Sequence, residues 1–123
     1  MKLRIQDNAI RFRLSQTEVS QLVYDGMVKS RCMFSKANLH YTILKNEDNH
    51  VISADFSENE VKVWLPSALV SGWDMDDRVG FDAYDTNGLY ILIEKDFKCL
   101  QPRLHEDESD LFANPNINHE HCP

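Results

Sequence analysis

Hydrophobic and polar residues alternate in two short segments near the start of the chain, KLRI at residues 2–5 and IRFRL at residues 10–14. A period of two is typical of strands that bury one face. Asp7 and Asn8 lie between the segments, and both residue types tolerate the backbone angles of a tight turn. The pattern therefore predicts a β-hairpin.

A helical pattern follows this hairpin. Residues 15–18, SQTE, form a capping-box motif of the kind that opens a helix. Val19, Leu22 and Val23 then recur at helical spacing, and Gly26 is a typical helix stop. We expect a helix of about two to three turns. Two further strands should follow it, around residues 28–34 and 39–44.

The same order of elements occurs a second time along the chain. A shift of 51 residues, reduced to 50 after one deletion, aligns the two copies. The aligned pairs are Ile5 with Phe56, Asp7 with Glu58, Asn8 with Asn59, Ile10 with Val61, Phe12 with Val63, Leu14 with Leu65, Val19 with Val70, Val28 with Val79, Leu39 with Leu89, Ile43 with Ile93, and Lys45 with Lys95. The chain thus contains two ββαββ units, at about residues 1–46 and 52–97.

Neither unit has enough apolar surface to be stable alone, so both should contribute to one core. A chain of 123 residues is the length of one ordinary domain. We therefore expect a mostly β fold, of the β-rich α+β class. Its two repeats should be related by an approximate two-fold axis in one barrel-like domain over residues 1–98, followed by an irregular tail over residues 99–123.

Three segments of the second unit carry a resemblance: KVWLP at residues 62–66, WDMDDRV at residues 73–79 and GLYILIEK at residues 88–95. They are similar to the swapped-hairpin repeat of AbrB and MazE-type proteins. The positions that match the family's acid and base strand motif and its helix-opening proline are Asp7, Arg11 and Ser15 in the first unit and Glu58, Lys62 and Pro66 in the second. Two repeats in one chain resemble MraZ, which implies an intramolecular version of a dimeric barrel.

The chain as a whole also resembles a group of small bacterial proteins of unknown function. These begin with M-K-x-R-I and contain an E-K-D-F-x-C-L segment before an acidic tail, as this chain does at residues 1–5 and 94–100. This second resemblance implies no particular activity.

Charge is distributed unevenly along the chain. The net charge of −7 argues against a protein that coats nucleic acid generally. Residues 1–45, however, carry eight Lys and Arg against three Asp and Glu, whereas residues 46–123 carry five against seventeen. The sequence shows neither an apolar leader nor a stretch long enough to span a bilayer, so we expect a cytoplasmic monomer or homodimer without membrane contact.

Four cations, Lys2, Arg4, Arg11 and Arg13, should point from one face of the first hairpin, because their apolar neighbours point inward. The AbrB-like resemblance implies that such strand arginines bind nucleic acid, and an acidic protein is the other candidate partner. The alternative is that these cations pair with carboxylates of the second half, for which Asp55, Glu58 and Glu60 are the candidates.

The tail contains five residues of types that bind Zn or Cu: Cys99, His105, His119, His121 and Cys122. Their spacing matches no standard zinc-finger pattern. A solvated acidic tail and, in an oxidising compartment, a Cys99–Cys122 disulfide are the alternatives.

Motifs of catalysis are missing from the sequence, which has no glycine-rich phosphate loop, no G-x-S-x-G and no H-E-x-x-H. We therefore expect a small non-enzymatic regulatory or interaction module that binds nucleic acid or an acidic partner through the first hairpin. The alternative is a transition-metal-binding protein that uses the tail.

Overall fold

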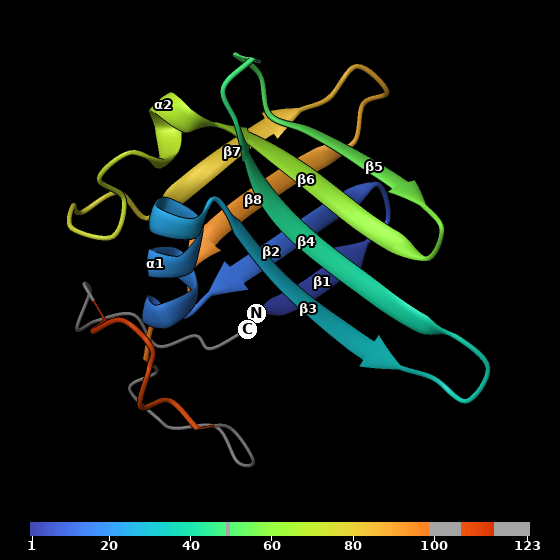
Figure 1. The fold of residues 1–123 in the computed structure, drawn as a ribbon, viewed down its shortest axis with the longest axis horizontal. Helices are drawn as coiled ribbons and strands as arrows, with labels where there is room; N and C mark the ends of the chain where they lie inside the picture. The colour runs from blue at the N-terminus through green and yellow to red at the C-terminus, as the bar shows by residue number, and fades with distance from the viewer. Residues whose placement is uncertain (49, 99–106, 115–123) are drawn as a thin grey trace.

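The computed structural model describes residues 1–48, 50–98 and 107–114, and their strands form two four-stranded sheets layered one over the other (Figure 1). The elements in chain order are β1 (Lys2–Gln6), β2 (Ala9–Leu14), α1 (Gln16–Asp25), β3 (Met27–Met33), β4 (Asn38–Asn46), β5 (Ser53–Ser57), β6 (Glu60–Pro66), α2 (Ser67–Val70), β7 (Gly80–Tyr84) and β8 (Tyr90–Lys95). The prediction of a mostly β fold with two ββαββ repeats is confirmed.

The two repeats exchange hairpins between the sheets. The first sheet has the strand order β1-β2-β8-β7 and the second has the order β3-β4-β6-β5, so each sheet takes one hairpin from each repeat. The hairpins meet through parallel pairs, β2 with β8 and β4 with β6. The two parallel ladders correspond residue by residue. In the first sheet Ile10 lies opposite Ile91 and Phe12 lies opposite Ile93. In the second sheet the equivalent pairs are Val61 with Tyr41 and Val63 with Ile43.

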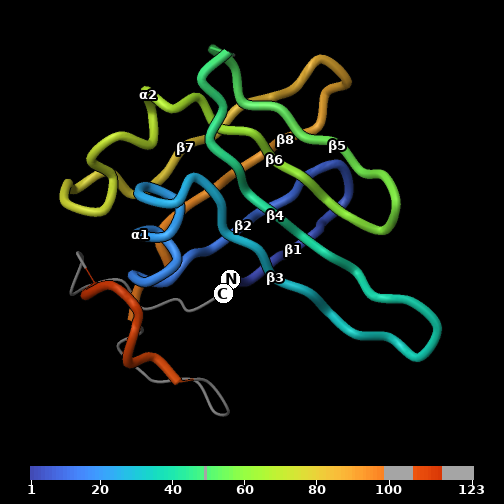
Figure 2. Tube along the Cα trace, viewed as in Figure 1, coloured from blue at the N-terminus to red at the C-terminus, as the bar shows by residue number. Residues whose placement is uncertain are grey.

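The sheets face each other as open layers. Among the described residues, no ladder joins β1 to β3 or β5 to β7, so the strands do not close into the barrel that the resemblance implied. The β3–β4 hairpin extends past the rest of the molecule (Figure 2). Met33 and Phe34 at its tip are therefore exposed.

One aligned pair of the sequence comparison is wrong. Val28 was matched to Val79, but Val28 lies opposite Ile43, and the residue opposite the equivalent Ile93 is Phe81. The shift at this strand is therefore 53 residues. The reason is the connection from the second helix to its next strand, which runs from Val70 to Gly80, whereas β3 begins two residues after α1 ends.

The two helices differ in how they begin. In α1 the Ser15 hydroxyl accepts from the Glu18 N–H at 3.3 Å, and the Glu18 carboxylate accepts from the Ser15 N–H at 2.9 Å. Gly26, with φ of 82°, ends the helix as predicted. Pro66 opens α2 without a side-chain cap, and α2 has four residues against ten in α1. Neither helix of the described chain is long and apolar enough to cross a membrane.

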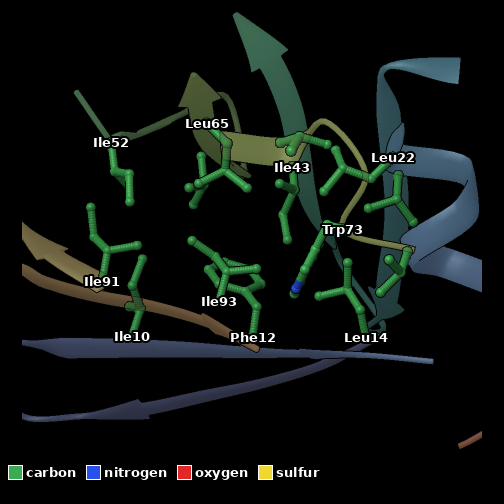
Figure 3. Close-up of a cluster of buried hydrophobic side chains, with 14 residues drawn as sticks. Ile10, Phe12, Leu14, Leu22, Ile43, Ile52, Leu65, Trp73, Ile91 and Ile93 are labelled. Atoms are coloured by element: carbon green, nitrogen blue, oxygen red, sulfur yellow. The ribbon is translucent and has the colours of Figure 1, made fainter. Parts of the chain in front are cut away.

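The core lies between the two sheets and takes residues from both repeats (Figure 3). Phe12, Ile43, Leu65 and Ile93 are fully buried there. Trp73, from the loop after α2, is also fully buried, and its indole N–H donates to the Arg78 carbonyl at 2.8 Å. A buried tryptophan with a satisfied N–H is a packing residue.

Residues 107–114, within the predicted irregular tail, run beside α1 (Figure 1). Leu111 is buried, and the Phe112 ring lies 5.9 Å from that of Phe97. The Phe112 N–H donates to the Asp96 carbonyl at 2.9 Å, and the Gln16 N–H donates to the Asp110 carbonyl at 2.9 Å. This part of the tail is irregular, as predicted, but it packs against the domain.

Candidate nucleic-acid interface

The four predicted cations lie on one face of the first sheet, opposite to the core. Lys2 lies directly across from Arg13 in the β1–β2 ladder, and Arg4 lies across from Arg11. Partners in such a ladder point to the same side of a sheet, as do residues two apart along a strand. Their neighbour Phe12 points the other way and is buried. We call this surface, including the corresponding side chains of β8 and β7, the outer face of the first sheet.

Two carboxylates from the second repeat contact these cations. Glu94 lies opposite Arg13 in the parallel ladder, and its Oε1 accepts from Arg11 Nε at 2.5 Å and from Arg13 Nε at 3.1 Å. Lys2 Nζ lies 2.6 Å from the buried Asp96 Oδ2. The cations therefore pair across the repeats, as the alternative interpretation expected, but with carboxylates that it did not name.

The carboxylates that the alternative did name lie elsewhere. Asp55 is opposite Lys62 in the second sheet, and Glu60 accepts from the Thr42 hydroxyl at 2.6 Å. Glu58 is exposed in the β5–β6 turn. The choice was wrong because the parallel pairing of β2 with β8 decides which residues face the arginines, and that pairing is not local in sequence.

The outer face keeps a surplus of positive charge beside the first hairpin. Glu94 and Asp96 balance two of the four cations on this hairpin, and Asp82 of β7 is a third carboxylate farther along the same face, so these groups together keep one positive charge in excess. Arg4 is exposed, and its Nη2 donates to the neutral Gln6 side chain at 3.1 Å. In the part of the chain that the structure describes, Arg4 is thus the cation of this set whose side chain is hydrogen-bonded to a neutral group.

Two tyrosines, which the sequence reasoning did not single out, lie on the same face. Tyr84 of β7 is opposite Tyr90 of β8, and their ring centroids are 5.0 Å apart at an angle of 49°. Tyr84 is 74% exposed. The Tyr90 hydroxyl donates to Asp82 at 2.8 Å, and this hydrogen bond raises the pKa of Tyr90 above its ordinary value. The alternation of Tyr90 with buried Ile91 was the signal that could have identified them.

The equivalent hairpin of the second sheet, β5–β6, is not basic. At the positions of the four cations, 51 residues along the chain, it carries Ser53, Asp55, Lys62 and Trp64. Lys62 Nζ lies 3.7 Å from Glu60. Lys29 and Arg31 are exposed on β3 of the same sheet, but no hairpin there carries four cations on one face of its strands, so the cluster of four on one hairpin is particular to the first sheet among the described residues.

A pocket of about 490 Å³ lies where the outer face meets the start of α1. Three of its four lining carboxylates contact other parts of the fold: Glu18 contacts the Met1 amino group at 2.5 Å, Asp96 contacts Lys2, and Asp110 accepts from the Thr17 N–H at 3.3 Å. These contacts join β1, α1 and residues 107–114. The contacts within its wall thus hold the fold together at this place.

The predicted metal ligands, Cys99, His105, His119, His121 and Cys122, lie outside the described residues, so a Zn or Cu site in the tail stays a prediction. Within residues 1–48, 50–98 and 107–114, no three His, Cys, Asp or Glu side chains are grouped to hold a metal ion.

The chain was also compared with known proteins. No curated protein and no solved structure matches it. The resemblance to AbrB and MazE-type proteins thus stays a prediction, whereas the expectation of a family without an assigned activity is confirmed. A family model matches residues 1–116, and the chain belongs to this family, described as a family of unknown function (DUF7009).

Proposed function

We propose that the protein is a non-enzymatic interaction module that binds nucleic acid through the outer face of the first sheet. One observation carries this proposal: the β1–β2 ladder sets Lys2 across from Arg13 and Arg4 across from Arg11, so four cations project together from two adjacent strands. Phosphate contacts with Lys and Arg supply most of the affinity of non-specific nucleic-acid binding.

The bridging carboxylate of Glu94 is compatible with this role. Each guanidinium has five N–H donors, and Glu94 Oε1 occupies few of those of Arg11 and Arg13. The shared carboxylate also holds the two arginines in fixed positions, which lowers the conformational entropy lost on binding. Glu94 therefore reduces the charge of the face while ordering its donors.

The acidic remainder of the chain favours binding at one orientation. Because the protein carries a net charge of −7, most of its surface repels phosphates. Phosphates are attracted only where cations are in surplus. The module should accordingly bind weakly and with a strong dependence on salt.

The test compares two equivalent charge reversals on exposed strands. Arg4→Glu should abolish retention of labelled oligonucleotides at low salt, because it reverses the charge of Arg4, whose hydrogen-bond partner Gln6 is neutral. Arg31→Glu, on β3 of the other sheet, is the matched control and should leave binding unchanged. Arg11 is a poorer choice for the main test, because a glutamate there would face Glu94. Both reversals are on the surface and should change the free energy of unfolding by about 0.5 kcal/mol or less.

The reciprocal change is Glu94→Gln, which removes a negative charge from between two arginines. It should tighten binding by roughly five-fold, the effect of about 1 kcal/mol of Coulomb repulsion. Fluorescence anisotropy over a salt series measures all three variants. If the wild-type protein retains no oligonucleotide at low salt, the proposal fails. Retention of a polyglutamate peptide in place of oligonucleotide would instead identify an acidic polypeptide as the partner.

A further inference from the structure

We infer that the outer face of the first sheet accepts single-stranded nucleic acid, with a base stacked on Tyr84 and the backbone running along Arg4 and Arg11. This inference rests on the proposed function and names its substrate class. It uses a feature that phosphate binding alone leaves unused, the exposed tyrosine pair.

The ladders place the tyrosines and arginines in adjacent rows of one face. Reading across the strands from β1 to β7, one row is Gln6, Ala9, Tyr90 and Tyr84, and the next is Arg4, Arg11, Leu92 and Asp82. Rows are two residues apart, about 7 Å, and neighbouring strands are about 4.8 Å apart. Arg11 and Tyr90 are thus diagonal neighbours, so one nucleotide can place its phosphate on Arg11 and its base over the tyrosines.

The tyrosines have the accessibility that base stacking requires. Tyr84 is 74% exposed, and the 49° tilt between the two rings leaves them out of face-to-face contact with each other. In the same row, the side chain beside Tyr90 on β2 is the methyl group of Ala9. The hydrogen bond from the Tyr90 hydroxyl to Asp82 fixes that ring in position. Tyr84 is the more accessible stacking partner.

Charge on the two sides of the face favours one strand over two. Cations lie on β1 and β2, whereas Asp82 lies on the β7 side, with Asp85 in the turn that follows. A single strand can place its phosphates over the cations and its bases toward the tyrosines. A duplex covers the whole face with phosphates on both of its sides, and its bases stack on one another and are unavailable to a side chain.

A cross-strand tyrosine pair also stabilises a sheet, so the test must separate stacking on a base from folding. Tyr84→Val removes the ring but keeps a strong strand former, and Tyr84→Phe keeps the ring and removes only the hydroxyl. Thermal unfolding of both variants establishes that each is folded. Any difference in binding between two folded variants then reports on the ring.

The experiment measures anisotropy of labelled poly(dT) and of a duplex of the same length. We expect poly(dT) to bind more tightly than the duplex, and Tyr84→Val to weaken poly(dT) binding by about five- to 150-fold, the loss of one stacked base. Tyr84→Phe should bind as the wild type does. The salt slope of Tyr84→Val should be unchanged, whereas Arg4→Gln, which removes one phosphate contact without reversing the charge, should reduce it by about 0.7 for single strands.

The outcomes distinguish this inference from the proposed function. If Arg4→Glu abolishes binding while Tyr84→Val changes nothing, or if the duplex binds as tightly as poly(dT), the single-strand inference is overturned and the nucleic-acid module stands. If the wild type binds neither probe, both are overturned.

Discussion

Phe12 in β2 and Val63 in β6 occupy equivalent positions in the two repeats, and both side chains are fully buried between the sheets. On the outward side of the hairpins that contain these strands, equivalent residues differ in charge: Arg4 corresponds to Asp55, and Arg13 corresponds to Trp64. The inward residues share one chemistry because they must fill a common core, whereas no such requirement acts on the outward ones. The interior therefore maintains the repeated skeleton, and function is to be sought where the two outer faces differ.

The helices show the same contrast. The first repeat uses ten residues of α1, closed at both ends by Ser15 and Gly26, to cover its end of the core. The second repeat has one helical turn in α2 and then fills its share of the core with Trp73 from the following loop. Equivalent positions in the fold are therefore covered by different local structures.

The largest effect should come from breaking the interior of one repeat. Phe12→Ala should lower the free energy of unfolding by about 3–5 kcal/mol, because it leaves a large cavity between the sheets. Val63→Ala, at the equivalent position, should cost only about 2 kcal/mol, because it removes less apolar volume. Urea unfolding followed by tryptophan fluorescence measures both. Equal losses of unfolding free energy in the two variants would show that cavity volume alone does not determine the cost.

A smaller effect should come from the cap that only the first repeat has. Ser15→Ala should destabilise the protein by about 1 kcal/mol, because the Glu18 N–H at the start of α1 loses its acceptor. The control is Ser67→Ala in α2, where the serine hydroxyl is buried without a hydrogen-bond partner among the described residues. Chemical denaturation should show little loss for this control. A loss as large as that of Ser15→Ala would contradict the assignment of the cap.

These elements also show what the sequence could and could not predict. The hairpin turns, the capping box of α1 and the inward residues were predictable, because each depends on neighbours in sequence. The pairing of Arg13 with Glu94 was not, because residues 81 positions apart meet only once the hairpins exchange. Phe81 was missed as the equivalent of Val28 because the loop after α2 changes the spacing between the copies. The tyrosine pair was missed for a different reason: the comparison of the repeats followed the inward residues, although the alternation of Tyr90 with Ile91 already predicts that Tyr90 points outward.

The smallest effect concerns a polar pair that only the second sheet has. Thr42, almost fully buried, donates its hydroxyl to Glu60 Oε2 at 2.6 Å, and this hydrogen bond is the main cause that holds the pKa of Glu60 below its ordinary value. The equivalents in the first sheet are Leu92 and Ala9, which form no such bond. Thr42→Val keeps the shape of the side chain and removes the donor, so the sheets become more alike in this respect.

Thr42→Val should therefore lower the free energy of unfolding at pH 7 by about 1 kcal/mol or less, the contribution of one hydrogen bond. Because the folded pKa of Glu60 lies below its unfolded value, the stabilisation is fully present above about pH 4.3 and is lost as the pH falls through the folded pKa. The difference in the free energy of unfolding between wild type and variant should decrease to zero over the same pH range. Urea unfolding at a series of pH values measures it, with Thr86→Val in the exposed β7–β8 turn as the control. A difference that persists at the lowest pH at which both proteins fold would mean that the bond does not depend on the ionised carboxylate.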